Sequence, residues 1–254
     1  PTMLEDMVTL AEENQAQLVV AGYYIDTYYN DTEYLTLNQV QPDAVYDQEA
    51  FRRSAYKLFD ANLLYTPWNK LFSRAYVDER GLRFPQTFWD DFPFVLSVIR
   101  DVERVAVTSK QYYHFMRARA ESETAAYRSN MYDKREEEHG WMLDLYAHWG
   151  VQDEASMEMV ARRYVERLVG CVENVTNPRC TLSKEEKRRE IAKIIGGEQA
   201  RKCLKLARPR SAMMKAILLP IKWNNVSLTM LESRVVSKVK SSNTKLFATL
   251  KAKR

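Results

Sequence analysis

Several features that mark special classes of protein are absent from this sequence of 254 residues. No apolar run approaches the roughly 20 residues that a helix needs to cross a bilayer, and the run at 216–221 is interrupted by Pro220. Only three cysteines are present, at a spacing that matches no zinc site, which argues against a disulfide scaffold and favours a reducing, cytoplasmic environment. The 46% hydrophobic and 28% charged residues are instead typical of an ordinary globular protein.

Acidic residues are almost missing from the C-terminal part of the chain. Residues 201–254 contain fourteen Lys and Arg but a single acidic residue, Glu232. Residues 1–200 contain 24 basic and 33 acidic residues, so an acidic body carries a strongly basic tail. We therefore expect the two parts to meet different partners. No nucleic-acid-binding motif accompanies the basic charge and the acidic body opposes it, so no nucleic-acid partner is expected.

The first half of the sequence mixes helical and strand patterns. Residues 3–14 have a helical apolar stripe. Thr2 and Glu5 have the spacing of a capping box at the start of this helix. Residues 18–23 form a short apolar run, which suits a buried strand of a largely parallel sheet. The other expected elements are a loop or edge hairpin over 26–46, a helix capped by Asp47, a helix over 92–100, and strands over 102–108 and 111–115.

Strand patterns disappear after about residue 128. An apolar stripe of helical period runs through 157–172, and Ser183 and Glu186 have the spacing of a second capping box. Further helical stretches are expected over 130–149, 198–206 and 226–240, with a break at Pro209 and Pro220. The sequence thus predicts an α/β body over residues 1–127 and an all-helical, basic extension over residues 128–254.

The stretch from Tyr65 to Asp91 is the most informative for function. Thr-Pro-Trp-Asn-Lys-Leu-Phe at 66–72 is followed by Gly-Leu-Arg-Phe-Pro at 81–85 and by Phe-Trp-Asp-Asp at 88–91. An aromatic residue, an amide and a lysine therefore precede two adjacent carboxylates that open a helix. The chemistry alone leaves two interpretations of the acid pair. Acids are favoured at a helix N-terminus by its free N–H groups and dipole, and a carboxylate can also deprotonate a hydroxyl.

The order of these motifs resembles bacterial family 2 glycosyltransferases, which build capsule, exopolysaccharide and lipopolysaccharide chains. The resemblance covers roughly residues 1–125, because the opening segment and Gln-Tyr-Tyr-His-Phe-Met-Arg at 111–117 are also similar to elements of that family. It implies a partial GT-A-like fold, with a mixed sheet, flanking helices and a helical C-terminal region. The family's acidic motif is usually Glu-Asp, and its Asp is the catalytic base. Asp91 falls on that Asp, and Asp90 replaces the Glu with a shorter side chain.

The resemblance implies an inverting transfer from a nucleotide-sugar donor to a glycan or lipid-linked acceptor in cell-surface polysaccharide synthesis. Asp91 and Asp90 are then the expected catalytic residues. The residues expected to bind substrate are Trp68, Asn69, Lys70 and Arg117. Two of these have a structural alternative, since Trp68 could equally belong to the core and Lys70 could be a solvated lysine.

The family also implies a divalent cofactor, Mg²⁺ or Mn²⁺, held on the donor diphosphate by an Asp-x-Asp motif. That motif precedes the segment that residues 1–24 resemble, and this sequence does not contain it in the matching context. We therefore expect the metal ligands to lie mostly outside these 254 residues, and the chain to be an incomplete fragment without activity of its own. His139 and His148 are too few to form a metal site.

The basic tail contains a stretch that suits an interfacial helix. Its apolar residues stand among cations, and such helices lie on anionic membrane surfaces. The residues concerned are Met213, Met214, Ile217, Leu218, Leu219 and Trp223, with Arg208, Arg210, Lys215 and Lys222. A peripheral position on the inner face of the membrane would bring the enzyme to a lipid-linked acceptor. The alternatives are a solvated basic face packed on the body and, for the whole chain, a non-catalytic module that binds a membrane or a partner.

Overall fold

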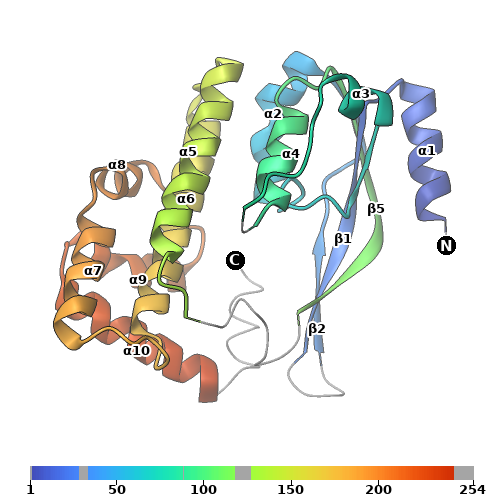
Figure 1. The fold of residues 1–254 in the computed structure, drawn as a ribbon. Coiled ribbons are helices and arrows are strands. Elements are labelled where there is room, and N and C mark those ends of the chain that lie inside the picture. Colours follow the sequence, from blue (N-terminus) through green and yellow to red (C-terminus); the bar gives the residue numbers. More distant parts are fainter. Residues whose placement is uncertain (1, 29–33, 88, 118–126, 243–254) are drawn as a thin grey trace. The chain divides into compact units, whose positions relative to one another are not determined.

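The computed structural model describes residues 2–28, 34–87, 89–117 and 127–242 (Figure 1). By their internal contacts the residues of the chain form two compact units. We call them the sheet unit, which comprises residues 1–26, 36–117 and 141–156, and the helical unit, which comprises residues 27–35, 118–140 and 157–254.

A five-stranded sheet forms the middle of the sheet unit, in the order β2-β1-β5-β3, with β4 also paired to β1. The strands are β1 (Leu18–Tyr28), β2 (Tyr34–Gln39), β3 (Ala44–Asp47), β4 (Lys70–Phe72) and β5 (Arg104–Arg117). The polar stretch 26–46 thus supplies two edge strands. The strands predicted over 102–108 and 111–115 are one continuous strand, which runs on through Ser109 and Lys110.

The strand pairs with a defined register are antiparallel. In β1 and β4 Val19 lies opposite Leu71, and in β3 and β5 Val45 lies opposite Ala106. The expectation of a largely parallel sheet is therefore wrong for these pairs. Its basis was the continuous apolar run of β1, and such a run reflects burial on both faces of a sheet, which flanking helices provide here without parallel pairing.

Four helices flank the sheet: α1 (Met3–Asn14), α2 (Gln48–Asp60), α3 (Arg74–Glu79) and α4 (Asp91–Ile99). α1 covers one face, where its Met7 packs with Val19, Ala21 and Ala106, and Figure 1 shows α2 and α4 on the other face. The Asp47 cap is confirmed, since its carboxylate accepts a hydrogen bond from the Ala50 N–H at 2.8 Å.

The predicted capping box at the start of α1 is wrong. The Thr2 backbone has φ −91° and ψ 0°, not the extended conformation of a capping residue, and its side chain accepts no capping hydrogen bond. The hydroxyl instead donates to the Asp6 carboxylate at 3.2 Å. The spacing of Thr2 and Glu5 matched the motif, but the backbone before the helix does not adopt the required geometry.

The remaining helices are α5 (Met131–Trp149), α6 (Glu154–Thr176), α7 (Lys184–Gly196), α8 (Glu198–Leu206), α9 (Ala212–Lys222) and α10 (Val226–Ser242). Residues 131–140 of α5 belong to the helical unit and residues 141–149 to the sheet unit. The capping box of Ser183 and Glu186 is confirmed, because each residue's backbone N–H donates to the other's side chain, at 2.7 and 3.2 Å. Within the described ranges, no helix is long and apolar enough to span a membrane.

The core of the helical unit is built around the apolar stripe of α6. Leu168 and Val172 of that stripe are fully buried with Ile194 of α7 and Leu218 of α9. The break expected at Pro220 is wrong, because Pro220 lies inside the last turn of α9. A proline there removes one helical hydrogen bond, and the burial of the apolar side chains around it outweighs that loss.

Candidate active site

The loop between α2 and β4 is fixed by Asn69, whose side chain is fully buried. Its Nδ2 donates to the carbonyl oxygens of Ala21 at 2.9 Å and Leu63 at 3.3 Å. Its own carbonyl accepts a hydrogen bond from the Ala21 N–H at 2.9 Å. A buried amide that satisfies backbone groups of β1 and of its own loop holds the two together. Within the folded chain, Asn69 therefore positions the residues on either side of it.

Lys70 follows directly and is buried too, so the alternative of a solvated lysine does not hold. Its Nζ donates to the carbonyl oxygens of Leu63 and Thr66, each at 2.5 Å, and to Oδ1 of Asn69 at 2.8 Å. Burial lowers the pKa of the Lys70 ammonium well below its ordinary 10.5, and the negative charge of Asp91 opposes that shift. Lys70 is thus a buried amine whose closest partners are uncharged oxygens.

Asp90 and Asp91 stand at the start of α4 but do not cap it. The Asp90 backbone is helical (φ −61°, ψ −23°) and its side chain makes no capping hydrogen bond. Among the residues that the structure describes, no donor contacts either carboxylate at hydrogen-bond distance. Burial raises the pKa of Asp91 above its ordinary 3.8, Asp90 raises it further, and Lys70 lowers it. The fold therefore leaves a partly buried carboxylate, within electrostatic reach of Lys70, that it does not use as a cap.

The residue before the acid pair has a strained backbone. Trp89 has φ +64°, in the left-handed region that bulky side chains rarely occupy. Such a conformation costs on the order of 1–3 kcal/mol and persists only where the surroundings impose it, often at functional sites. The turn at Trp89 sets the direction in which Asp90 and Asp91 enter α4.

An aromatic cluster surrounds Trp68, the residue before Asn69. The Trp68 ring stacks on Tyr113 at 4.2 Å and lies parallel to Phe115 at 5.7 Å between centroids. The Tyr23 ring meets it edge to face at 4.6 Å. Trp68 is therefore packed, while Tyr113 and Phe115 leave more than a third of their surface exposed. Sequence reasoning named neither as a binding residue, although their i, i+2 spacing on a strand places both on one face.

The structure brings some predicted site residues together and leaves others undetermined. The ring of Tyr65, in the loop that Asn69 fixes, stacks at 4.9 Å on Phe92, the residue after Asp91. The loop with Asn69 and Lys70 therefore packs on the start of α4. Arg117 is the last residue of β5, and its side chain lies outside the described residues.

The histidines of the sheet unit have structural partners. His114 Nδ1 lies 2.8 Å from a carboxylate oxygen of buried Asp26, and its ring stacks on Tyr24. Burial works to raise the pKa of Asp26, but hydrogen bonds from Thr36 and His114 outweigh it and lower that pKa. His148 contacts Asp101 at 2.7 Å.

A thiol–imidazole pair in the helical unit is not an activated nucleophile. Cys203 Sγ lies 3.7 Å from His139 Nε2, which also contacts Gln199 at 2.8 Å. Burial lowers the pKa of His139 to about 4 and raises that of Cys203 to about 12, so both are neutral at pH 7. No three His, Cys, Asp or Glu side chains of the described chain lie close enough together to hold a metal ion.

Comparisons with known proteins support the fold. No family model matches the sequence, and no curated protein matches it. Among solved structures the chain is similar to S. aureus TarS residues 1–349 in complex with UDP-GlcNAc, with a TM-score of 0.55 and 13% identity. The match covers 93% of this chain and 64% of the TarS chain. Likeness at this identity shows the fold alone: a partial GT-A-like mixed sheet with flanking helices and a helical C-terminal region, as the sequence predicted.

Proposed function

We propose that this chain forms the acceptor side of a glycosyltransferase that uses a nucleotide-sugar donor. The fold is that of a structural neighbour, TarS, which is a wall teichoic acid glycosyltransferase solved with UDP-GlcNAc. The observation that carries the proposal is Asp91. It begins α4 without capping it, it interacts electrostatically with buried Lys70, and burial raises its pKa. Because the Asp91 carboxylate forms no capping hydrogen bond, it stays available to accept a proton as a general base.

In the proposed reaction Asp91 removes the proton of an acceptor hydroxyl as that oxygen attacks the anomeric carbon of the donor sugar. The attack comes from the face opposite the nucleotide diphosphate, which leaves with the electron pair of the broken C–O bond. One displacement of this kind inverts the configuration. A raised pKa strengthens Asp91 as a base, and the charge of Lys70 favours its ionised form.

The neighbouring residues have supporting roles in this proposal. Asn69 and Lys70 are buried and hold the loop in place, so we propose a positioning role for both and not the substrate binding expected from the sequence. Asp90 raises the pKa of Asp91. Trp68, with Tyr113 and Phe115, offers aromatic surface to a sugar ring, and Arg117 stays a proposed substrate contact.

A divalent metal ion, Mg²⁺ or Mn²⁺, remains part of the proposal for the whole enzyme. It would stabilise the charge that develops on the leaving diphosphate. The described residues contain no cluster of three potential ligands and so do not fit such an ion.

The decisive variant is Asp91→Asn, made in the gene product that contains these residues. The amide keeps the shape of the side chain but cannot accept the proton, so we expect kcat for sugar transfer to fall by about 10²–10⁴-fold. Asp78→Asn is the matched control, because Asp78 is exposed on α3 and forms surface ion pairs with Arg74 and Arg83. Undiminished transfer by the Asp91 variant would remove Asp91 from the mechanism.

Two further measurements separate the finer parts of the proposal. The anomeric configuration of the product, read by NMR, tests the single displacement, since retention would require a different mechanism. The 254 residues alone, with UDP-GlcNAc and Mn²⁺, are expected to show neither hydrolysis nor transfer. Turnover by that chain would contradict the proposal that the metal ligands lie outside it.

A further inference from the structure

α9 does not present the apolar face that the sequence predicted for membrane binding. Met214 and Leu218 are buried in the core of the helical unit, and Ile217 packs against that core. Of the predicted apolar set, only Leu219 and Trp223 are exposed. The periodic apolar pattern of 213–223 is therefore mainly a core pattern, and the prediction of an interfacial helix over these residues is wrong.

α10 instead has an apolar stripe that the core does not cover. Its members are Leu228, Leu231, Val235 and Val239, exposed by 38%, 59%, 54% and 39%. The spacing of i, i+3, i+7 and i+11 places all four on one face of the helix. The opposite face is anchored in the helical unit, since Met230 is buried and the hydroxyls of Ser233 and Thr176 lie 2.7 Å apart. The stripe is thus the outward face of a docked helix.

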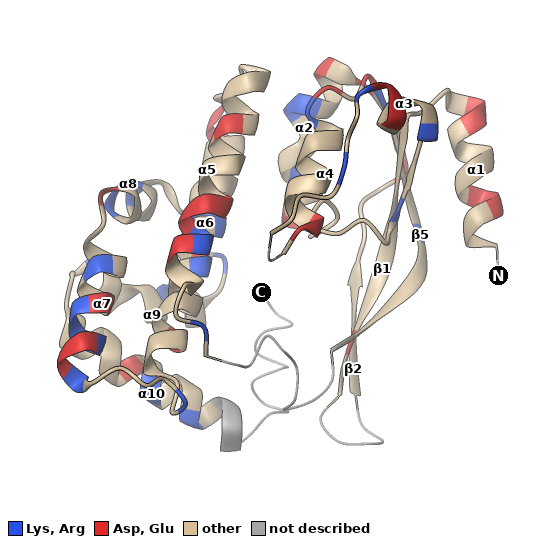
Figure 2. Ribbon diagram, in the orientation of Figure 1, with Lys and Arg blue, Asp and Glu red and all other residues tan. Residues whose placement is uncertain are grey.

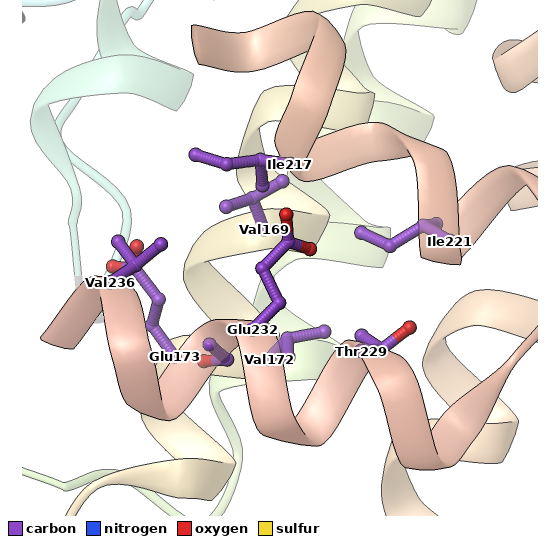
Figure 3. Close-up of a pocket in the computed structure, with 9 residues that line it drawn as sticks. Val169, Val172, Glu173, Ile217, Ile221, Thr229, Glu232 and Val236 are labelled. Atoms are coloured by element: carbon purple, nitrogen blue, oxygen red, sulfur yellow. The ribbon is translucent and has the colours of Figure 1, made fainter.

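The cations of α10 lie along one margin of the stripe, and the acidic residue at its other margin, Glu232, turns into a pocket. Arg234 and Lys238 are exposed on α10, and at 100° per residue both fall along one margin of the stripe. Residues 201–242 contain ten Lys and Arg and one acid, and Figure 2 shows blue segments along α9 and α10. That acid, Glu232, extends into a pocket toward Val169 and Ile217 (Figure 3).

We propose that this face of α10 binds the surface of an anionic lipid bilayer. The four apolar side chains would enter the boundary between headgroups and acyl chains, and the cations would pair with lipid phosphates. Trp223 lies just before α10, and an exposed Trp suits the same boundary. The basic excess favours a bilayer over a protein partner, since protein interfaces are depleted in Lys. The proposal does not depend on Asp91 or on sugar transfer.

The first test is co-sedimentation of the full chain with vesicles of phosphatidylcholine, with or without phosphatidylglycerol. We expect at least about tenfold tighter binding to the anionic vesicles, and weaker binding as salt is added. The variant Leu231→Glu/Val235→Glu is expected to lose this binding. Its control is Leu4→Glu/Val8→Glu on α1, which makes the same changes at exposed positions and should bind like the parent.

A second variant tests the charges without changing the apolar stripe. Arg234→Gln/Lys238→Gln should weaken binding to anionic vesicles by roughly 10- to 30-fold and reduce its salt dependence. Equal binding to both vesicle types, no binding to either, or equal loss in the α1 control would overturn the proposal. Another result would also overturn it: the chain associates with itself, the Leu231→Glu/Val235→Glu variant does not, and neither binds vesicles. The stripe would then contact a second copy of the chain.

Discussion

The sheet unit and the helical unit each bury a Lys or Arg side chain, and these two side chains have different partners. In the helical unit, buried Arg162 donates to the carboxylate of Glu158, one turn earlier on α6, at 3.1 Å. In the sheet unit, buried Lys70 donates to three uncharged oxygens, and Asp91 accepts no hydrogen bond from any described residue. Charge pairs within a helix serve the fold. Buried Asp26 of the sheet unit also has a partner, His114, at 2.8 Å, so Lys70 and Asp91 are exceptions within their own unit. Their arrangement is not explained by a charge pair that serves the fold, which supports the proposed role of Asp91.

Backbone conformation separates the two units in the same way. Left-handed residues of the sheet unit are Gln15, Asn62, Gly81, Trp89 and Gly150, whereas Asn224 is the only one in the described part of the helical unit. The loops of the sheet unit therefore contain more residues in backbone conformations that most side chains avoid.

Four of the five tryptophans, at 68, 89, 141 and 149, belong to the sheet unit, so intrinsic fluorescence follows mainly its unfolding.

The largest effect is expected from replacing the buried lysine. Lys70→Met removes three hydrogen bonds and leaves the Thr66 carbonyl without its donor, while the Leu63 carbonyl keeps Asn69 Nδ2 at 3.3 Å and Asn69 Oδ1 keeps the Thr66 hydroxyl at 3.4 Å. We expect the free energy of unfolding, followed by fluorescence, to fall by about 3 kcal/mol. The matched change in the helical unit is Lys193→Met, where the ammonium pairs with Asp133 at the surface at 3.4 Å. That loss should stay below about 1 kcal/mol. An equal loss in the free energy of unfolding for the two variants would mean that the buried lysine contributes no more to stability than the surface lysine.

The same variant sharpens the role of Asp91 through the pH dependence of transfer. The charge of Lys70 lowers the pKa of Asp91, so its removal raises that pKa. A general base acts in its ionised form, and activity falls as the pH drops through its pKa. The acidic limb of the kcat/KM profile should therefore move to higher pH in Lys70→Met. If the acidic limb stays at the same pH, the charge of Lys70 does not influence the pKa of the general base.

A smaller effect is expected in the pocket of the helical unit. Burial raises the pKa of Glu232 from 4.5 to about 7. Below pH 4.5 the carboxyl is protonated in both the folded and the unfolded state, and above pH 7 the folded state holds the charged form at a cost. Glu232→Gln should therefore stabilise the unit above pH 7, by about 1–2 kcal/mol after allowance for the open side of the pocket, and have little effect near pH 4.

The readout is urea denaturation followed by circular dichroism at pH 4 and pH 8, which reports on the helices. Glu185→Gln, on the exposed first turn of α7, makes the same chemical change outside the pocket. A stability gain for Glu232→Gln that is equal at both pH values would mean that burial of the carboxylate does not cause it.

Sequence patterns predicted the local features of both units. The stripe of α6 and the capping interactions of Ser183 and Asp47 depend on residues within one or two turns, and spacing predicted them. The same spacing failed at Thr2, whose backbone is not extended. Burial of Lys70 could not be predicted, because its acceptors belong to a loop whose path is set by Asn69 and β1. The same limit explains α9, since an apolar period is identical for a helix against a core and a helix on a membrane.

Part of the candidate site was predictable, but its geometry was not. The acid pair and the aromatic residue were found from the order of motifs, whereas the choice between a cap and a free carboxylate depends on the backbone of Trp89 and Asp90. The exposure of Tyr113 and Phe115 depends on which face of β5 the helices leave open. These properties arise from tertiary packing, which a single sequence does not specify locally.

The smallest effects come from one substitution made in both units. Gly81 ends α3 with φ +60°, and a Cβ there would meet no atom within 4 Å, so Gly81→Ala should cost about 1 kcal/mol through backbone strain alone. Gly170 is exposed inside α6 with similar open space, and Gly170→Ala should stabilise the helical unit by about 0.5–1 kcal/mol. Fluorescence should detect the first and circular dichroism the second. The added methyl group is the same in both variants, so stability changes of opposite sign come from the backbone conformation at each glycine. Stability changes of the same sign would contradict this explanation.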